Sequence, residues 1–322
     1  MTKRRFAAAV LTLILLLTSV SSAFAWEIET PDATPEMYEK PENRNIPMPE
    51  GISRIYLDLP YCGENSTKTE KLHLLLPEDG EGPYPVLISV HGGGLEANNS
   101  TRNHEVSFTQ KAAFAGLQHG YAVACVDYTL KTSKGPAVFP LAIQEVRAAV
   151  RYIRSVAAQY HLDPDHIALI GESAGGMLVG LLGVIGGDKK YDYDNPDFGN
   201  MEYSGDVQAV IVQYAAGRSM GNKATAQYYK VKEKKLTQEM VDAVTALNFI
   251  DANDPPYYFD HGKEDSSVPY TTSIEFYEAM TAAGVENCEL HIYEGMEHAV
   301  QWFQSDYVND RHFEWLDKVF NR

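Results

Sequence analysis

The sequence has 322 residues, of which 44% are hydrophobic and 22% are charged. This composition is ordinary for a globular protein, and the length is enough for one large α/β domain with a substantial core. The formal net charge is -17, and no basic cluster alternates with aromatic residues. We therefore expect no nucleic-acid partner, and we interpret the acidic surface as serving solubility.

The first 25 residues are typical of an export signal. Positions 3–5 are basic, an apolar stretch of about 15 residues runs from Phe6 to Val20, and Ala23 and Ala25 are the small residues that a signal peptidase recognises. The alternative is an uncleaved membrane anchor, but the apolar stretch is shorter than the roughly 20 residues of a spanning helix. We expect cleavage after Ala25, a secreted or extracytoplasmic protein, and no stable membrane insertion after cleavage.

The chain has three cysteines, Cys62, Cys125 and Cys288, so at least one thiol is unpaired within the chain. Export would permit a disulfide. Cys125 lies inside an apolar strand pattern, where a free cysteine behaves as a small hydrophobic residue. The sequence leaves open whether Cys62 and Cys288 pair.

Residues 26–51 are rich in Pro, Glu and Asn, which predicts a linker or a strap over the surface. The main domain, residues 52–322, opens with two extended segments that can pair as a hairpin. Strand and helix patterns then alternate to the end of the chain. Strands are predicted at 84–90, 121–130, 166–173, 206–215, 255–262 and 288–295, and helices at 109–120, 141–160, 174–186, 237–250, 271–284 and 306–320.

Strands that alternate with helices predict right-handed crossovers and a mainly parallel sheet. Residues 86–90 and 167–170 are almost continuously apolar, as expected for strands buried on both faces. The predicted fold class is therefore α/β, with a mainly parallel twisted sheet and helices on both faces. Residues 186–204 interrupt the alternation with polar, aromatic and turn-forming residues, and predict either an insertion that overhangs a site or a solvated loop.

A G-x-S-x-G pattern, Gly171-Glu172-Ser173-Ala174-Gly175, stands where a predicted strand ends and a predicted helix begins. A tight turn there exposes the serine oxygen and points it at the helix N-terminus, which favours developing negative charge. The turn crowds its neighbours, which requires glycine on both sides. Because a serine hydroxyl is a poor nucleophile until a base takes its proton, the pattern needs partners from elsewhere in the chain.

A glycine run, His91-Gly92-Gly93-Gly94, directly follows the strand predicted at 84–90. Consecutive glycines let the backbone turn its amides toward one point, where they can bind an oxyanion. The alternative is a flexible turn. The run lies one strand-helix-strand unit before the serine, which favours the oxyanion interpretation.

Asp265 and His298 each follow a predicted strand near the C-terminal end of the chain. Parallel strands deliver such loops to one edge of the sheet, the edge at which open α/β sheets bind ligands. Ser173, Asp265 and His298 are therefore expected to lie together, in the chain order of an α/β-hydrolase triad.

Two other acids and one other histidine are rival candidates. Asp260 falls within the strand pattern, Glu264 directly precedes the favoured acid, and His291 lies in mid-strand. We therefore prefer Asp265 as the acid and His298 as the base.

On these motifs, the chain from about Ile55 to Phe320 resembles the α/β-hydrolases. Among them it is most similar to carboxylesterases with an HGGG oxyanion loop, which include hormone-sensitive-lipase-like esterases and bacterial acetyl-xylan and feruloyl esterases. The resemblance implies a Ser-His-Asp triad that works through an acyl-enzyme.

In that mechanism Ser173 attacks an ester carbonyl. His298 takes the proton of the Ser173 hydroxyl and passes it to the leaving alcohol, and Asp265 orients the imidazole. The N–H groups of Gly93, Gly94 and Ala174 form the oxyanion hole, and water cleaves the acyl-enzyme. The reaction needs no cofactor, and no H-x-x-x-H or C-x-x-C spacing indicates a metal site.

The expected substrate is a small-molecule or carbohydrate ester, and the favoured acyl groups are acetyl and feruloyl. Small general esters are the alternative. No long apolar lid segment, as in a lipase, is visible. Six aromatic residues are candidates for a binding surface, with packing in the core or the insertion as the alternative: Tyr191, Tyr193, Phe198, Tyr203, Trp302 and Phe303.

Two further hypotheses use the same fold. A serine peptidase of the prolyl-oligopeptidase type shares the triad, but it usually carries a propeller domain, and its oxyanion site uses a tyrosine in place of HGGG. A catalytically inactive binding protein would also keep the fold, although such proteins usually lose the serine or the histidine, and this chain has both.

Overall fold

The computed structural model of the chain describes residues 26–40, 45–47, 52–63, 66, 69–96, 105–186, 191 and 193–322. The expected signal peptide lies outside the described residues. Parts of the expected strap and of the 186–204 insertion lie outside them as well.

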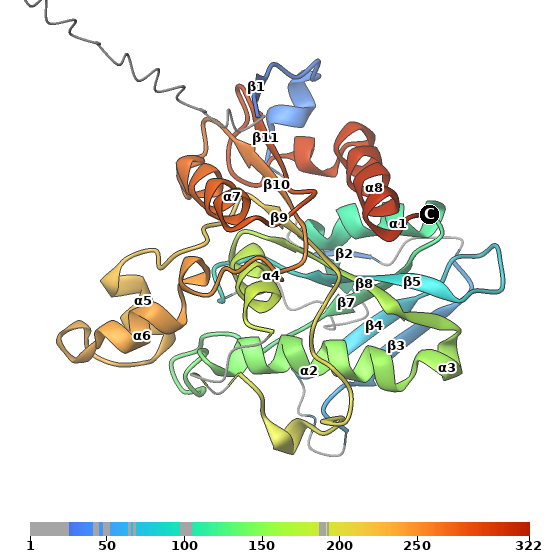
Figure 1. Cartoon of the computed structure of the whole chain (residues 1–322), viewed down its shortest axis with the longest axis horizontal. Coiled ribbons are helices and arrows are strands. Elements are labelled where there is room, and N and C mark those ends of the chain that lie inside the picture. Colours follow the sequence, from blue (N-terminus) through green and yellow to red (C-terminus); the bar gives the residue numbers. More distant parts are fainter. Residues whose placement is uncertain are drawn as a thin grey trace, which may run out of the picture.

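A twisted sheet of nine strands organises the described residues (Figure 1). Its order is β1-β11-β10-β9-β8-β5-β7-β4-β3. The pairs β3–β4 and β4–β7 are antiparallel and the other neighbours are parallel, which confirms the predicted hairpin and the mainly parallel sheet. The strands are β1 (Ile28–Glu29), β3 (Ile55–Pro60), β4 (Lys71–Leu75), β5 (Tyr84–Val90), β7 (Ala122–Val126), β8 (Leu162–Glu172), β9 (Ala209–Gln213), β10 (Tyr257–Gly262) and β11 (Glu289–Tyr293).

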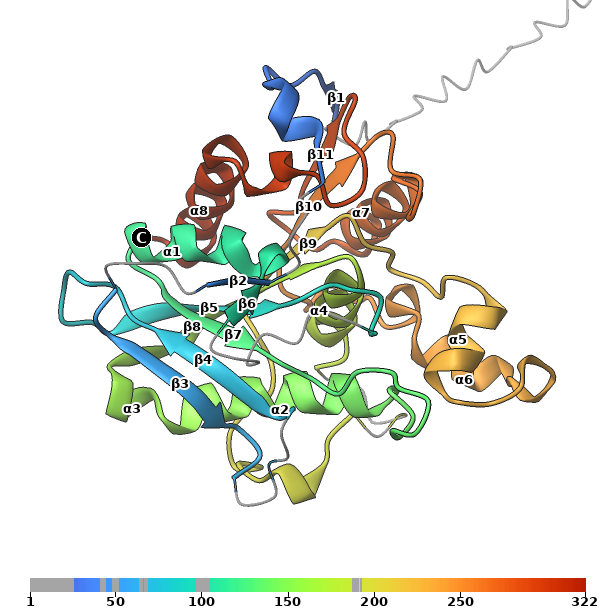
Figure 2. The ribbon, with the colours of Figure 1, turned by 180° about the vertical axis from the view of Figure 1, so that it is seen from behind.

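Two hydrophobic clusters, one on each face of the sheet, form most of the core. Successive strand residues alternate between them: Ile88 and Leu169 belong to one cluster, Leu87 and Ile170 to the other. The first face is covered by α2 (Leu141–Ser155), α4 (Ala174–Val184) and α7 (Thr271–Ala283), and the second by α1 (Ala115–Gln118) and α8 (Asp306–Phe320) (Figure 2). Helices therefore lie on both faces, as predicted.

The helix boundaries follow the prediction closely for α4, α7 and α8, and less closely elsewhere. The helix predicted at 141–160 is divided at Val156 into α2 and α3 (Ala157–Tyr160). The helix predicted at 109–120 is a 3-10 segment, Phe108–Phe114, followed by the short α1. In the part of the chain that the structure describes, the remaining elements are a small sheet of β2 (Asn45–Pro47) and β6 (Glu105–Ser107), with α5 (Asn222–Tyr228), α6 (Gln238–Ala243) and five more 3-10 turns at Pro35–Tyr38, Pro196–Phe198, Glu233–Lys235, Ala246–Asn248 and Gln301–Gln304.

The described part of the 186–204 insertion packs along α2. Asp194 forms ion pairs with Arg147, at 2.7 Å, and with Arg151, at 2.6 Å. Tyr193 is buried, and its hydroxyl donates to the carbonyl of Ala243. Charge pairing and packing thus fix Tyr193 and Asp194 to the domain, whereas residues 201–204 are exposed.

All three cysteines are free in the structure. Cys62 and Cys125 are buried, and the thiol sulfur of Cys288 accepts a hydrogen bond from the N–H of Tyr257. Among the described residues, no helix combines the length and apolarity needed to span a bilayer. Within the same residues, no group of three His, Cys, Asp or Glu side chains is placed to hold a metal ion.

Candidate active site

Ser173 occupies the bend between β8 and α4, with φ 52° and ψ -117°. Few non-glycine residues adopt a positive φ, so this backbone is strained. The serine N–H donates to the carbonyl of Gln213 on β9, and the serine carbonyl accepts from Met177 inside α4. These two bonds, one to the sheet and one to the helix, hold the strained residue at the sheet edge.

The glycines on both sides of Ser173 make the bend possible. A Cβ atom on Gly175 would lie 2.0 Å from the carbonyl oxygen of Val90 on β5. A Cβ on Gly171 would lie 2.5 Å from the carbonyl oxygen of Gly175. Backbone atoms block both positions, so a side chain at either would force β5, β8 and α4 apart.

A continuous chain of hydrogen bonds joins Ser173, His298 and Asp265, the three residues that the sequence predicts as a triad. The Nε2 atom of His298 lies 2.9 Å from the Oγ of Ser173, and its Nδ1 lies 2.6 Å from the Oδ2 of Asp265. Such a row of hydroxyl, imidazole and carboxylate can take a proton from the serine oxygen and stabilise the resulting imidazolium.

Asp265 is buried, and backbone and side-chain donors surround its carboxylate. Oδ1 accepts from the N–H groups of Ser267 and Val268, both at 2.8 Å. Burial alone would raise the pKa of Asp265, but the hydrogen bonds from His261 and His298 outweigh it and hold that pKa well below its usual range. The carboxylate therefore stays ionised beside His298 at neutral pH.

The HGGG loop lies directly against the serine bend. A Cβ on Gly92 would lie 2.7 Å from the carbonyl oxygen of Glu172 and 3.3 Å from the Cβ of Ser173. Gly93 and Gly94 follow with positive φ values of 104° and 66°, and Ala174 is the first residue of α4, where backbone N–H groups are free of intrahelical partners. The two segments that carry the expected oxyanion donors thus meet at Ser173.

His91 is the first residue of the HGGG loop, and its contacts hold the beginning of that loop in place. It is fully buried, its ring stacks on Tyr128 with centroids 4.4 Å apart, and its carbonyl accepts from the Tyr128 hydroxyl. Its Nδ1 lies 2.8 Å from the carbonyl oxygen of Gly92. Burial lowers the pKa of His91, which favours the neutral ring.

The His298 loop rests on an aromatic cluster. The ring of Tyr214 meets the His298 imidazole edge-on, with centroids 5.0 Å apart, and Phe303 packs against Tyr214. Trp302 and Phe303 are buried in this cluster. Of the six aromatic residues named as a binding surface, Tyr193, Trp302 and Phe303 are therefore core residues.

Two of the three rival candidates, Asp260 and His291, are engaged with other partners. Asp260 is buried in β10, where it accepts from the hydroxyl of Tyr293 and pairs with His312 on α8. Glu264 is exposed. His291 contacts Glu29 through Nδ1, at 2.6 Å.

Two side chains that the sequence did not single out also meet the site. His261, fully buried at the end of β10, lies 3.2 Å from the Oδ2 of Asp265 through its Nε2. Glu297, the neighbour of His298, accepts from the N–H of Ser266 at 2.7 Å. The only sequence signal for them was proximity, because each lies within four residues of a candidate.

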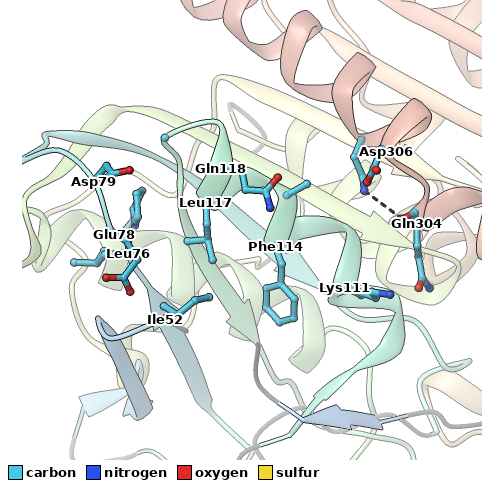
Figure 3. Close-up of a pocket in the computed structure, with 14 residues that line it drawn as sticks. Ile52, Leu76, Glu78, Asp79, Lys111, Phe114, Leu117, Gln118, Gln304 and Asp306 are labelled. Carbon is cyan, nitrogen blue, oxygen red and sulfur yellow. Dashed lines mark hydrogen bonds between the residues drawn. The ribbon is translucent and has the colours of Figure 1, made fainter. Parts of the chain in front are cut away.

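A separate cavity of about 610 Å³ lies between α1, the start of α8 and the β3–β4 hairpin (Figure 3). Apolar side chains line one part of it, among them Ile52, Phe114 and Leu117, and polar side chains such as Gln118 and Asp306 line the rest. None of Ser173, Asp265, His298 or the HGGG glycines is among its lining residues, so it is distinct from the site.

Curated relatives resemble this chain over about three quarters of its length. The probable isoprenylcysteine alpha-carbonyl methylesterase ICMEL1 of Arabidopsis thaliana is 24% identical over 248 residues, 73% of this chain and 49% of that protein. An acetylxylan esterase of Xylanibacter ruminicola is 26% identical over 234 residues, 71% of this chain and 44% of that protein. The chain thus spans about half the length of the curated relatives it matches.

Solved structures share the fold. A truncated form of a carbohydrate esterase from gut microbiota superimposes with a TM-score of 0.71 at 23% sequence identity, covering 86% of this chain and 99% of that one. This likeness confirms the α/β-hydrolase fold expected from the motifs. The BD-FAE family model matches residues 72–280, well over half of the sequence, and the chain accordingly belongs to the BD-FAE family.

Proposed function

We propose that the protein is a serine ester hydrolase in which Ser173, His298 and Asp265 act as the catalytic triad. The observation that carries the proposal is the hydrogen-bond chain itself, with 2.9 Å from Ser173 Oγ to His298 Nε2 and 2.6 Å from His298 Nδ1 to Asp265 Oδ2. The strained backbone of Ser173 supports it, because strain of this kind persists where function requires it.

In the proposed reaction, Ser173 Oγ attacks the ester carbonyl carbon while His298 Nε2 takes the hydroxyl proton. The N–H groups of Gly93, Gly94 and Ala174 stabilise the tetrahedral oxyanion. The C–O bond to the alcohol then breaks, and the alcohol leaves with the proton from His298. Water, deprotonated by His298, releases the acid and regenerates the serine.

We further propose that the natural substrates are short acyl or aromatic acyl esters on carbohydrates, with acetyl and feruloyl groups favoured. The support is the likeness to a protein named acetylxylan esterase and to a structure described as a carbohydrate esterase. Small general esters remain the alternative substrate class.

The test is an acid-release assay on residues 26–322, with Ser173→Ala as the control. Acetylated xylan, methyl ferulate and p-nitrophenyl esters of increasing acyl length are offered in parallel. Release of acetate or ferulate that Ser173→Ala abolishes supports a carbohydrate esterase. Turnover of short p-nitrophenyl esters alone supports a general esterase and contradicts the carbohydrate assignment.

The same preparation tests the two competing hypotheses. A serine peptidase would cleave peptide p-nitroanilides, which the proposed esterase leaves untouched. An inactive binding protein would leave Ser173 unlabelled by a fluorophosphonate probe, whereas an activated serine reacts and Ser173→Ala does not.

We propose that residues 1–25 are removed as a signal peptide, so that the enzyme of residues 26–322 works outside the cytoplasm. The domain begins close to this point, because β1 starts at Ile28. Mass spectrometry of the exported protein is expected to find Trp26 as its first residue. An intact Met1 in the exported fraction would contradict cleavage.

A further inference from the structure

Two imidazoles share one oxygen of the Asp265 carboxylate. His298 Nδ1 lies 2.6 Å from Oδ2, and His261 Nε2 lies 3.2 Å from the same atom. Oδ1 is occupied by the N–H groups of Ser267 and Val268. All four acceptor positions of the carboxylate are thus used, and His261 supplies the second bond to Oδ2 through an Nε2–H that also faces the Val268 carbonyl.

The surroundings of His261 determine where its proton lies. Nε2 faces the carbonyl oxygen of Val268, at 2.9 Å, and the carboxylate of Asp265, and both are acceptors without a hydrogen to give. Nε2 must therefore carry the hydrogen. Nδ1 lies 2.7 Å from the hydroxyl of Ser273, which can donate to it.

His261 also connects the acid loop to two fixed parts of the fold. Its own backbone is in β10, paired with β11. Ser273, its partner, is buried at the start of α7, and the Ser273 Oγ lies 3.3 Å from the carbonyl oxygen of Ala215. Ala215 directly follows Tyr214, whose ring contacts His298. The ring of His261 is thus immobilised on both sides.

We propose that His261 is a positioning residue of the triad. Its Nε2–H group fixes Asp265 Oδ2 in line with His298 Nδ1, so that the base is held in the orientation and tautomer that transfer a proton from Ser173. The inference rests on the proposed triad and adds a fourth side chain to it. A side chain that does not touch substrate should act on kcat and leave KM unchanged.

Two substitutions of His261 distinguish the role of its Nε2–H donor from that of its Nδ1 contact with Ser273. The amide of His261→Gln reaches the position of Nε2 and can still donate to Asp265. The amide of His261→Asn reaches only the position of Nδ1, so it keeps the contact with Ser273 and loses the one with Asp265. The kcat for p-nitrophenyl acetate is expected to fall at least about tenfold in His261→Asn, as for the loss of a hydrogen bond to a charged group.

His261→Gln should recover most of that loss, and KM should stay within about twofold in both variants. The control is His312→Asn, which removes another buried imidazole from another buried carboxylate, Asp260. It should lower the melting temperature and leave kcat unchanged. A folded His261→Asn with the kcat of the native enzyme, or an equal loss in both His261 variants, would overturn the proposal.

A measurement on the unaltered protein covers the case in which His261→Asn does not fold. In ¹⁵N-histidine NMR spectra, His261 is expected with its hydrogen on Nε2. A ring with a bare Nε2 overturns the proposal. Neither result depends on the proposed activity. If the native enzyme hydrolyses no ester while His261 shows this tautomer, the proposed function fails and the Asp265–His261 bond stands.

Discussion

The carboxylate of Glu297 accepts a 2.7 Å hydrogen bond from the backbone N–H of Ser266, and these two residues are the immediate neighbours of His298 and Asp265. The same side chain pairs with Lys40, at 3.0 Å. Glu297 therefore joins the loop of the imidazole, the loop of the acid and the segment that follows β1. It is a second contact that sets the distance between His298 and Asp265.

We predict that Glu297→Ala lowers kcat about three- to tenfold, because the two loops lose the connection directly beside Asp265 and His298 and the base is positioned less well. KM should change little. The measurement is steady-state hydrolysis of p-nitrophenyl acetate. Glu286→Ala, at an exposed carboxylate before β11, is the control, because Glu294 also joins the two loops through its pair with Lys263. Equal losses in the two variants would contradict the role of Glu297.

Glu29 on β1 is the centre of an ion-pair network, with His291 Nδ1 and Arg311 Nη1 both at 2.6 Å. Burial alone would raise the pKa of Glu29, but these partners lower it from 4.5 to about 2. A carboxyl with a lower pKa in the folded state stabilises the fold above its unfolded pKa. That contribution is lost as the pH falls from about 4.5 towards about 2.

His291 acts in the opposite direction. Burial alone would lower its pKa, but Glu289 and Glu29 raise it above the ordinary 6.5. Its contribution is present below pH 6.5 and is lost as the pH rises through the higher folded pKa. The network should therefore stabilise the fold most strongly between about pH 5 and pH 6.5.

We predict that Glu29→Gln lowers the free energy of unfolding by on the order of 2 kcal/mol in that window. The difference in free energy of unfolding between the native protein and Glu29→Gln should become smaller below and above that pH window. Urea unfolding at a series of pH values measures this, with the exposed Glu27→Gln as the control. If the difference in free energy of unfolding between the native protein and Glu29→Gln stays constant down to pH 3, Glu29 is not held ionised by its partners.

Gly175 is predicted to tolerate no side chain. The Cβ of Gly175→Ala would lie 2.0 Å from a backbone oxygen of β5, which cannot move without breaking the sheet. We expect a loss of at least about 3 kcal/mol in stability. Gly180→Ala, in the same helix, brings a Cβ to 3.2 Å from the ring of Phe276, which can shift slightly. Thermal unfolding should give Gly175→Ala a much lower melting temperature than Gly180→Ala. Equal melting temperatures would show that the backbone around Gly175 is not crowded.

The parts of the fold that the sequence predicted well are those with local signals. The strand, bend and helix around Ser173 are specified by apolar runs and by glycines within about 20 residues of each other. The meeting of Ser173, Asp265 and His298 could also be predicted, because a parallel sheet brings the loops that follow its strands to one edge. Neither inference needed any long-range contact to be known in advance.

Contacts that depend on side-chain placement could not be predicted in this way. His261 is a buried histidine at a strand end, and nothing in its sequence surroundings distinguishes a partner of Asp265 from a packed core residue. β1 has two residues, Ile28–Glu29, too few for a strand pattern, and it forms only because β11 offers a free edge. Trp302 and Phe303 are aromatic, as expected for a binding surface, yet they are buried in the cluster that contains Tyr214.

The assignment of the acid gives the sharpest prediction, because Asp260 and Asp265 are both buried and both pair with a histidine. Asp265→Asn replaces an acceptor-only carboxylate with an amide that offers one oxygen to four donors. His298 is then free to adopt the wrong tautomer, and kcat should fall by about 10⁴. Asp260→Asn should instead weaken the contact between β10 and α8, lowering the melting temperature while kcat stays within about threefold. Hydrolysis of p-nitrophenyl acetate below both melting temperatures separates the two effects. If Asp260→Asn is the variant that loses turnover, the buried pair with His312 belongs to the catalytic machinery and Asp265 only shapes its loop.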